Sequence, residues 1–314
     1  MNIRDIARMA NVSLSTVSRV INEEQYVSDE KRKLVQEVIK KTGYTKNGNA
    51  VKLSTGKSGV IGVQIPYNNS CYDHLIDSVL LATKEKGYQV QLLPTYYEQE
   101  TENYYYSMLE QKLFDGLILT SRTPHPINWS RLMAKGKLVS TEKLDDTELP
   151  MIYADREQAY DQLFSQLRAK KIQDVVFVTK RSADQSITTQ NKIKAFERYF
   201  GPAVEGENYF VGIDDYESGY SWAKEHAAKG IIPTYLYTNG DTTAAGILSA
   251  FQESGFVHKK DFYLVGEGNS SYSKLLNFST IDFSSKEIGQ ACVDFLLSNQ
   301  QQVCCRKEAR FILR

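Results

Sequence analysis

The 314-residue sequence predicts an α/β protein with doubly wound parallel sheets, preceded by a small all-α unit. From residue 59 onward, short apolar runs alternate with amphipathic stretches of helical length, a pattern typical of parallel sheets covered by helices on both faces. Before residue 59 the apolar residues recur at helical spacing. About ten strands are more than one such sheet usually holds, so we expect two lobes with a cleft at the carboxyl ends of the strands.

The N-terminal segment predicts three short helices. Apolar residues over 3–10 lie at helical spacing, Asn11 suits a left-handed turn, and Ser13 is a good N-cap for the second helix. The third helix is expected to run from Ser28 to Gly43. We expect the second and third helices to bury the following residues: Leu14, Val17, Ile21, Leu34, Val35, Val38 and Ile39.

The second helix also carries a polar face. Ser15, Ser18, Arg19 and Asn22 stand at positions i, i+3, i+4 and i+7. Small hydrogen-bonding side chains allow close approach to a major groove, and an Arg can grip guanine or phosphate. A solvated face of an ordinary three-helix bundle is the alternative interpretation.

The charges of the chain are unevenly distributed, although the net charge is zero. Residues 1–57 carry eleven basic and six acidic side chains, an excess of five positive charges. Since the whole chain is neutral, the remaining residues carry an excess of five negative charges. A basic head on an acidic body suits a polyanionic partner at one end. We expect no membrane segment and a cytoplasmic protein, because neither a secretory signal nor a long apolar stretch is present. No metal site is expected from the four cysteines, Cys71, Cys292, Cys304 and Cys305.

Residues 2–22, NIRDIARMANVSLSTVSRVIN, resemble the headpiece of the LacI/GalR repressor family, with its pattern D-[IV]-A-x-x-A-x-V-S-x-x-T-V-S-R-V-[IL]-N. The resemblance implies a helix-turn-helix unit over residues 1–46 that binds operator double-stranded DNA. It implies that Leu14 and Ser15 read bases, and that Leu14 offers only apolar contact, for instance to a thymine methyl. The other implied DNA-binding residues of this unit are Ser13, Thr16, Ser18, Arg19 and Asn22.

Residues 47–58 resemble the family's hinge. Asn47, Ala50 and Leu53 match its pattern, whereas Lys46 replaces a Pro and Val51 an Arg. In the family this segment folds on operator DNA and its Leu wedges into the minor groove, which implies DNA contacts for Ala50 and Leu53. A plain flexible linker is the alternative.

Residues 59–314 resemble the family's periplasmic-binding-protein-like core. We expect one lobe over residues 59–157 and 285–302, and the other over 158–284 and 303–314, with the change of lobe near Asp155. The family's ligands lie between the lobes. The matching positions imply effector contacts at Tyr67, Asn68, Tyr72, Ser121, Asp155, Thr188, Lys192, Asp214, Gly240, Asp241, Gly268, Asn269 and Phe283.

Three of these positions depart from the family pattern. Lys192 replaces an Arg, Gly268 replaces an acceptor Asp, and Asp214 stands where an aromatic residue is frequent, although a small shift would bring Tyr216 there. A compact cation and a lost acid favour an anionic ligand, such as a phosphorylated sugar.

The resemblance therefore implies a homodimeric repressor that binds a pseudo-palindromic operator and answers to a carbohydrate or its phosphorylated derivative. It implies no cofactor. A regulator controlled by a partner protein is the alternative, as in the family's catabolite control proteins. A solute-binding protein or an enzyme on the same fold is the more remote one. The sequence lacks the G-x-G-x-x-G, P-loop and G-x-S-x-G motifs expected of common α/β enzymes.

Overall fold

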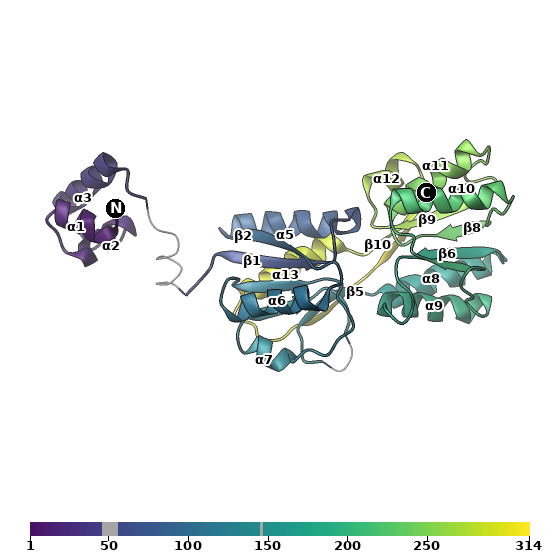
Figure 1. The fold of residues 1–314 in the computed structure, drawn as a ribbon, viewed down its shortest axis with the longest axis horizontal. Helices are drawn as coiled ribbons and strands as arrows, with labels where there is room; N and C mark the ends of the chain where they lie inside the picture. The colour runs from purple at the N-terminus through teal and green to yellow at the C-terminus, as the bar shows by residue number, and fades with distance from the viewer. Residues whose placement is uncertain (46–55, 145–146) are drawn as a thin grey trace. The chain divides into compact units, whose positions relative to one another are not determined.

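The structure is a computed structural model that describes residues 1–45, 56–144 and 147–314. The chain divides into two compact units, residues 1–58 and 59–314. Figure 1 shows the first as a small cluster of helices and the second as two sheets flanked by helices. No helix among the described residues is long and apolar enough to cross a membrane.

The N-terminal unit contains α1 (Ile3–Met9), α2 (Leu14–Ile21) and α3 (Asp29–Thr42). Two expected turns are confirmed, since Asn11 and Gly43 both adopt left-handed backbone with φ of 50° and 63°. Asn2 and Asp5 form a reciprocal cap at the start of α1. The fully or nearly buried side chains of its core are Ile6, Ala7, Ala10, Val17, Val20 and Val35.

Two residues assigned to this core are exposed. Leu14 and Leu34 each retain 44% of their accessible surface, whereas Val20 is buried instead. Leu14 is the first residue of α2, directly after the cap, so it lies beyond the contact with α1. The expected helical spacing was right, but the inward face is rotated toward Val17 and Val20.

The first lobe is a six-stranded parallel sheet in the order β11-β5-β4-β3-β1-β2. Its strands are β1 (Val60–Ile65), β2 (Gln89–Pro94), β3 (Gly116–Leu119), β4 (Lys137–Ser140), β5 (Met151–Ala154) and β11 (Cys304–Lys307). Alternate residues of β1 and β3 point to opposite faces. One face packs on α5 (Asp73–Glu85) and α13 (Ser285–Leu297), the other on α6 (Gln99–Glu110) and α7 (Trp129–Met133).

The second lobe is a six-stranded sheet in the order β12-β10-β9-β8-β6-β7. Its strands are β6 (Val175–Thr179), β7 (Tyr209–Val211), β8 (Tyr235–Tyr237), β9 (Tyr263–Glu267), β10 (Ser279–Asp282) and β12 (Arg310–Ile312). All of its pairs are parallel except β10 with β12. One face packs on α8 (Arg156–Ala169) and α9 (Ile187–Phe200), the other on α10 (Tyr216–Ala228) and α11 (Asp241–Glu253). The short α12 (Ser271–Leu275) follows β9.

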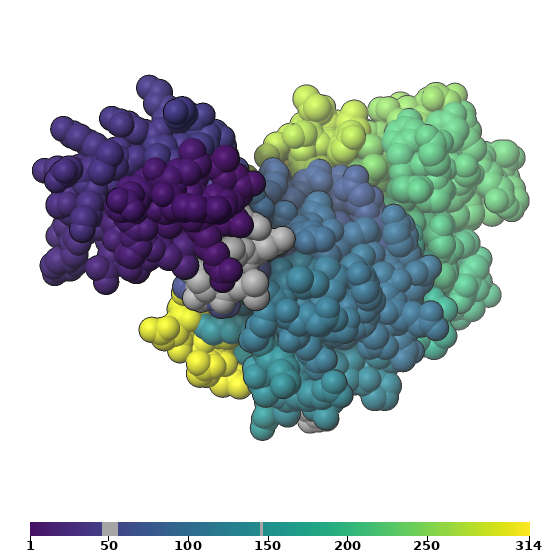
Figure 2. Space-filling model, turned by 60° about the vertical axis from the view of Figure 1, so that its left-hand side comes forward, coloured from purple at the N-terminus to yellow at the C-terminus, as the bar shows by residue number. Residues whose placement is uncertain are grey.

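The chain passes between the lobes three times. It crosses after β5, where Asp155 caps α8, and returns between β10 and α13. The last crossing corrects the expected boundary at residue 303, because β11 pairs with β5 in the first sheet and only β12 joins the second. The short sequence of β11, CCRK, has no strong apolar face, so only its pairing shows which sheet it joins. In Figure 2 the blue-to-teal first lobe and the green second lobe are distinct masses, and yellow C-terminal residues lie against the first.

Candidate functional site

The polar face of α2 is organised by its cap. The Ser13 hydroxyl accepts the backbone N–H of Thr16 at 3.2 Å and lies 2.8 Å from the hydroxyls of both Ser15 and Thr16. These contacts fix the first turn of α2 and leave small hydroxyl groups at the surface. Such a surface permits close approach to the floor of a DNA groove.

The expected DNA-contact residues of α2 lie on this surface. Leu14, Ser15, Arg19 and Asn22 are exposed, and Thr16 and Ser18 are half-buried. The Arg19 Nε atom lies 3.8 Å from Glu24 in a pair that is about half exposed. A pair of this kind contributes little, so the guanidinium is free to exchange Glu24 for a base or phosphate. The expected contacts at Ala50 and Leu53 lie outside the described residues.

A cleft between the two lobes opens at the carboxyl ends of the strands, as the fold predicts. Its empty volume is about 1130 Å³, which includes the open mouth. Among the expected effector residues, those that line it are Tyr67, Tyr72, Ser121, Thr188, Lys192, Gly268 and Phe283.

Other expected effector residues do not line this cleft. Asn68 is exposed beside it, and Asp155 caps α8, pairs with Arg306 at 3.1 Å and lines a smaller adjoining pocket. Asp214 lies one layer behind the lining, where it pairs with Lys180 at 2.7 Å and accepts the Tyr67 hydroxyl at 2.9 Å. It therefore orients two lining side chains.

The expected effector residues at the start of α11 and after β9 make contacts within the second lobe. Gly240 is the N-cap position of α11, and the Asp241 carboxylate accepts bonds from Ser270 and Thr280. The Asn269 side chain is bonded to Asp282 and Arg314. Tyr216 stacks on Tyr220 and does not reach the cleft either. The polar side chains of Asp241 and Asn269 are thus already hydrogen-bonded within the protein, and none of these residues lines the cleft.

Sequence reasoning missed most of the charged lining and one aromatic residue. Each of these residues comes within three positions of the end of a parallel strand, and that rule is the signal that would have found them. They are Tyr97 after β2, Glu142 after β4, Arg156 after β5, Lys180 and Arg181 after β6, and Glu267 at the end of β9.

Lys192 lines the cleft, but its charge is not available to a ligand in the way that the sequence predicts. Its side chain is only 2% exposed. Its ammonium group lies 3.2 Å from the Glu267 carboxylate and 4.2 Å from the centre of the Tyr237 ring. Burial lowers the pKa of Lys192, and the Glu267 carboxylate opposes this shift. Tyr237 donates its hydroxyl to Glu267 as well. The cation is therefore already neutralised by a neighbouring acid.

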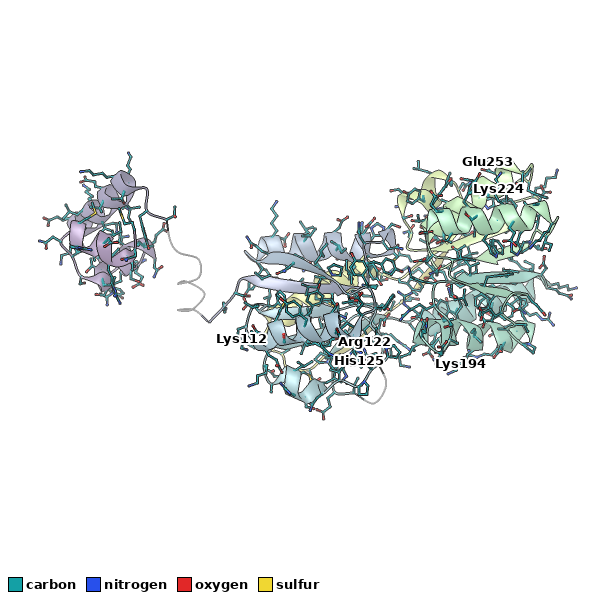
Figure 3. All side chains as sticks on the ribbon, in the orientation of Figure 1. Lys112, Arg122, His125, Lys194, Lys224 and Glu253 are labelled. Carbon is teal, nitrogen blue, oxygen red and sulfur yellow. The ribbon has the colours of Figure 1, made fainter. Side chains whose placement is uncertain are left out.

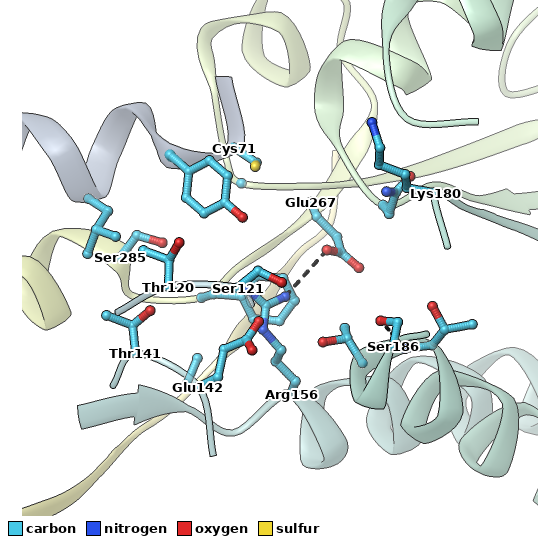
Figure 4. A pocket seen from close by; sticks show the side chains of 18 of the residues that line it. Cys71, Thr120, Ser121, Thr141, Glu142, Arg156, Lys180, Ser186, Glu267 and Ser285 are labelled. Atoms are coloured by element: carbon cyan, nitrogen blue, oxygen red, sulfur yellow. Dashed lines mark hydrogen bonds and ion pairs between the residues drawn. The ribbon is translucent and has the colours of Figure 1, made fainter. Parts of the chain in front are cut away.

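Gly268 stands where the family has an acceptor Asp, but the preceding residue, Glu267, provides a carboxylate in the cleft. Glu267 projects into the cleft and lies 3.6 Å from Arg156, whose guanidinium is centred 4.0 Å from the Phe283 ring (Figure 4). The expectation of fewer acids was therefore wrong. A shift of one residue moves a side chain to the other face of a strand, which a pattern match does not resolve.

A buried polar network supports the loop after β3 that carries Ser121. The fully buried Glu102 accepts the backbone N–H of Thr123 at 2.8 Å and its hydroxyl at 2.9 Å. The Arg122 guanidinium donates to the carbonyls of Thr123 and His125. Figure 3 labels the side chains of Arg122 and His125, which lie close together in the first lobe. These bonds hold the loop in one conformation at the edge of the cleft. Within the described residues, no cluster of three or more His, Cys, Asp or Glu side chains is arranged to hold a metal ion.

Comparison with known proteins identifies the family. Residues 2–47 match the model of bacterial regulatory proteins of the lacI family, and residues 58–303 match that of periplasmic binding proteins and the sugar binding domain of the LacI family. The chain is 36% identical over 303 residues to catabolite control protein B of Bacillus subtilis (strain 168), which covers 95% of each chain.

Solved structures share the fold over the whole chain. The Lac repressor dimer bound to operator and the anti-inducer ONPF has a TM-score of 0.80 at 21% identity, and covers 100% of this chain and 98% of its own. A complex of the transcriptional regulator CelR with cellobiose has a TM-score of 0.68 at 16% identity, and covers 100% and 99%. With two family models matched in order and a relative this similar over its full length, the chain belongs to the LacI family of DNA-binding transcriptional regulators.

Proposed function

We propose that this chain represses transcription as a homodimer bound to a pseudo-palindromic operator, and that a small polar ligand in the interlobe cleft controls it. The observation that carries the proposal is the cleft itself. Polar, charged and aromatic side chains from both lobes converge there, at the strand ends where ligands of such folds bind. A ligand that contacts both lobes changes the relative stability of their arrangements, which is what a regulator requires.

The DNA-reading surface supports the operator part of the proposal. Leu14 places an exposed apolar side chain beside the hydroxyls of Ser13, Ser15 and Thr16, and Arg19 extends from the same helix. Leu14 suits a thymine methyl, whereas Arg19 suits guanine or a phosphate. The half-site is therefore expected to combine a thymine contact with a guanine or backbone contact.

Exposed apolar side chains support the dimer. In the second lobe Leu275 retains 81% of its accessible surface, next to the exposed Tyr272 and Leu276 on the short α12 segment. In the first lobe Leu80 and Leu81 are exposed on α5. Exposed apolar side chains that lie near one another in sequence on one segment are typical of protein interfaces. A homodimer with a twofold axis would also present its two headpieces to inverted half-sites of the operator.

A carbohydrate is the ligand class we propose. Tyr67, Tyr72 and Tyr97 line the cleft and provide flat aromatic surface, while Ser121 and Thr188 provide hydroxyl groups. The CelR structure, which has the same fold, is a complex with cellobiose, and this supports a sugar as the ligand class here.

Footprinting and sedimentation test the DNA and dimer parts. We expect an inverted-repeat footprint and a particle of twice the 35.7 kDa chain mass. Arg19→Ala is expected to cost about 1–3 kcal/mol of operator binding if the residue reads guanine. Leu275→Glu is expected to weaken the dimer, with Glu217→Lys on the exposed start of α10 as a control away from the apolar patch. An asymmetric or sequence-independent footprint would contradict the proposal.

Calorimetry with a panel of sugars and their phosphates tests the ligand. Binding that changes operator affinity is the expected result. If no small molecule binds while operator binding is intact, control by a partner protein becomes the better explanation, and the polar cleft would then serve only to join the lobes.

A further inference from the structure

Arg181 connects the two lobes across the cleft. It follows β6 of the second lobe, and its guanidinium donates to the Ser121 hydroxyl at 3.0 Å and to the Arg122 carbonyl at 3.4 Å, both on the loop after β3 of the first lobe. The guanidinium also lies over the Tyr97 ring, 3.9 Å from its centre. All of these partners are neutral groups.

The other cations of the cleft differ from Arg181 in this respect. Lys192 and Arg156 share the Glu267 carboxylate, and Lys180 pairs with Asp214 at 2.7 Å. Among the described residues, no carboxylate lies within 4.0 Å of the Arg181 nitrogen atoms. A half-buried guanidinium held by a hydroxyl and a carbonyl still carries a positive charge that no acid contacts directly.

The nearby acid Glu142 does not take that role. It lines the cleft but is not within ion-pair distance of Arg181. Burial raises the pKa of Glu142, while the positive charges of Arg156, Arg181 and Arg122 oppose the shift. Four cations and two carboxylates line the cleft, and Asp214 pairs with Lys180 from behind the lining, so the excess is one positive charge.

The backbone that presents Tyr97 is strained. Tyr96 and Tyr97 both adopt positive φ angles, of 52° and 58°, which bulky residues rarely do. Such conformations persist only where the surrounding structure enforces them. In this conformation the centre of the Tyr97 ring lies 3.9 Å from the Arg181 guanidinium, and the Tyr97 hydroxyl lies 3.2 Å from Ser121. The guanidinium plane is thereby fixed before any ligand arrives.

We propose that Arg181, oriented by Tyr97, is the residue that selects an anionic ligand, binding a carboxylate or phosphate group in place of the Ser121 hydroxyl. This inference rests on the proposed ligand-binding function of the cleft. A planar guanidinium binds two oxygens of such a group side by side, and the reduced water access of a half-buried site strengthens the bond. The same group would stand between the lobes, because Arg181 and Ser121 belong to different ones.

The test compares the full-length protein with Arg181→Gln and Arg181→Lys. Arg198→Gln is the matched control, since Arg198 is a surface residue of α9 paired with Asp161. The probes are glucose, gluconate, glucose 6-phosphate and inorganic phosphate, at constant ionic strength. Thermal shifts followed by tryptophan fluorescence and calorimetry both report binding.

We expect at least one anionic probe to stabilise the wild type and the control, and to bind Arg181→Gln about ten- to a hundred-fold more weakly. Arg181→Lys keeps the charge but loses the planar guanidinium, so its affinity for the anion is expected to lie between those of the wild type and Arg181→Gln. The relative effects of gluconate and glucose 6-phosphate show whether a carboxylate or a phosphate is preferred.

Two results would overturn the inference. One is anion binding that Arg181→Gln leaves unchanged, and the other is the absence of any binding by the anions. If glucose binds while the anions do not, the cleft is still a ligand site and only the role of Arg181 is wrong. Operator binding, measured in parallel on each variant, separates these results from a failure of the regulator itself.

Discussion

Replacing Lys192 by Met tests whether this side chain supports the fold rather than the ligand. The Lys192 ammonium and the Glu267 carboxylate form a pair 3.2 Å apart in which both side chains are less than 10% exposed. Lys192→Met keeps most of the side-chain volume and removes the charge. Glu267 would then be a buried carboxylate without its nearest cation.

The structure limits how large the loss is. Breaking a buried pair by removing one partner typically costs about 3–5 kcal/mol. Here Glu267 keeps the Tyr237 hydroxyl and the Arg156 guanidinium at 3.6 Å, so we expect about 2–3 kcal/mol of unfolding free energy to be lost. The double variant Lys192→Met/Glu267→Gln removes both charges and is expected to recover to within about 1 kcal/mol of the wild type.

Chemical denaturation followed by tryptophan fluorescence measures this effect. The only two tryptophans, Trp129 and Trp222, lie one in each lobe, so the signal reports the lobes and not the headpiece. If Lys192→Met unfolds at the same denaturant concentration as the wild type, or at a higher one, the ion pair does not stabilise the lobe as we argue. If the double variant is less stable than the single one, the two charges are not coupled.

Three further predictions follow from single positions. Gly246→Ala is expected to lower the melting temperature, because its Cβ would lie 2.1 Å from the Tyr216 carbonyl oxygen and force α10 and α11 apart at a cost of about 1–3 kcal/mol. Burial lowers the pKa of His258 from 6.5 to about 4. Between these two pH values the unfolded chain is protonated at His258 and the folded chain is not, so the free energy of unfolding falls as the pH falls from 6.5 to about 4. His258→Gln is expected to reduce that acid loss by about 1–2 kcal/mol after allowance for solvent screening, measured as unfolding free energy against pH. Leu53→Ala is expected to weaken operator binding and reduce DNA bending in gel-shift assays, because the family resemblance places a minor-groove wedge there; unchanged bending would mean that the hinge works differently.

The sequence by itself determined the order and type of the main elements. Helical periodicity, the Ser13 cap and the turn at Asn11 are local signals, because capping and backbone preference act within a few residues. The alternation of strands and helices after residue 59 likewise determined two parallel sheets and the end of the sheets at which a cleft forms. The family motif is local in the same sense.

Only the tertiary structure decided which side chains meet in the cleft and how their charges pair. Lys192 and Glu267 are 75 positions apart in sequence, and no local pattern shows that one neutralises the other. Arg181 gains its role from Ser121 and Tyr97 on the opposite lobe. The physical reason is that electrostatic interaction depends on distance and burial, which are set when distant strand ends come together, whereas secondary structure depends on neighbours along the chain.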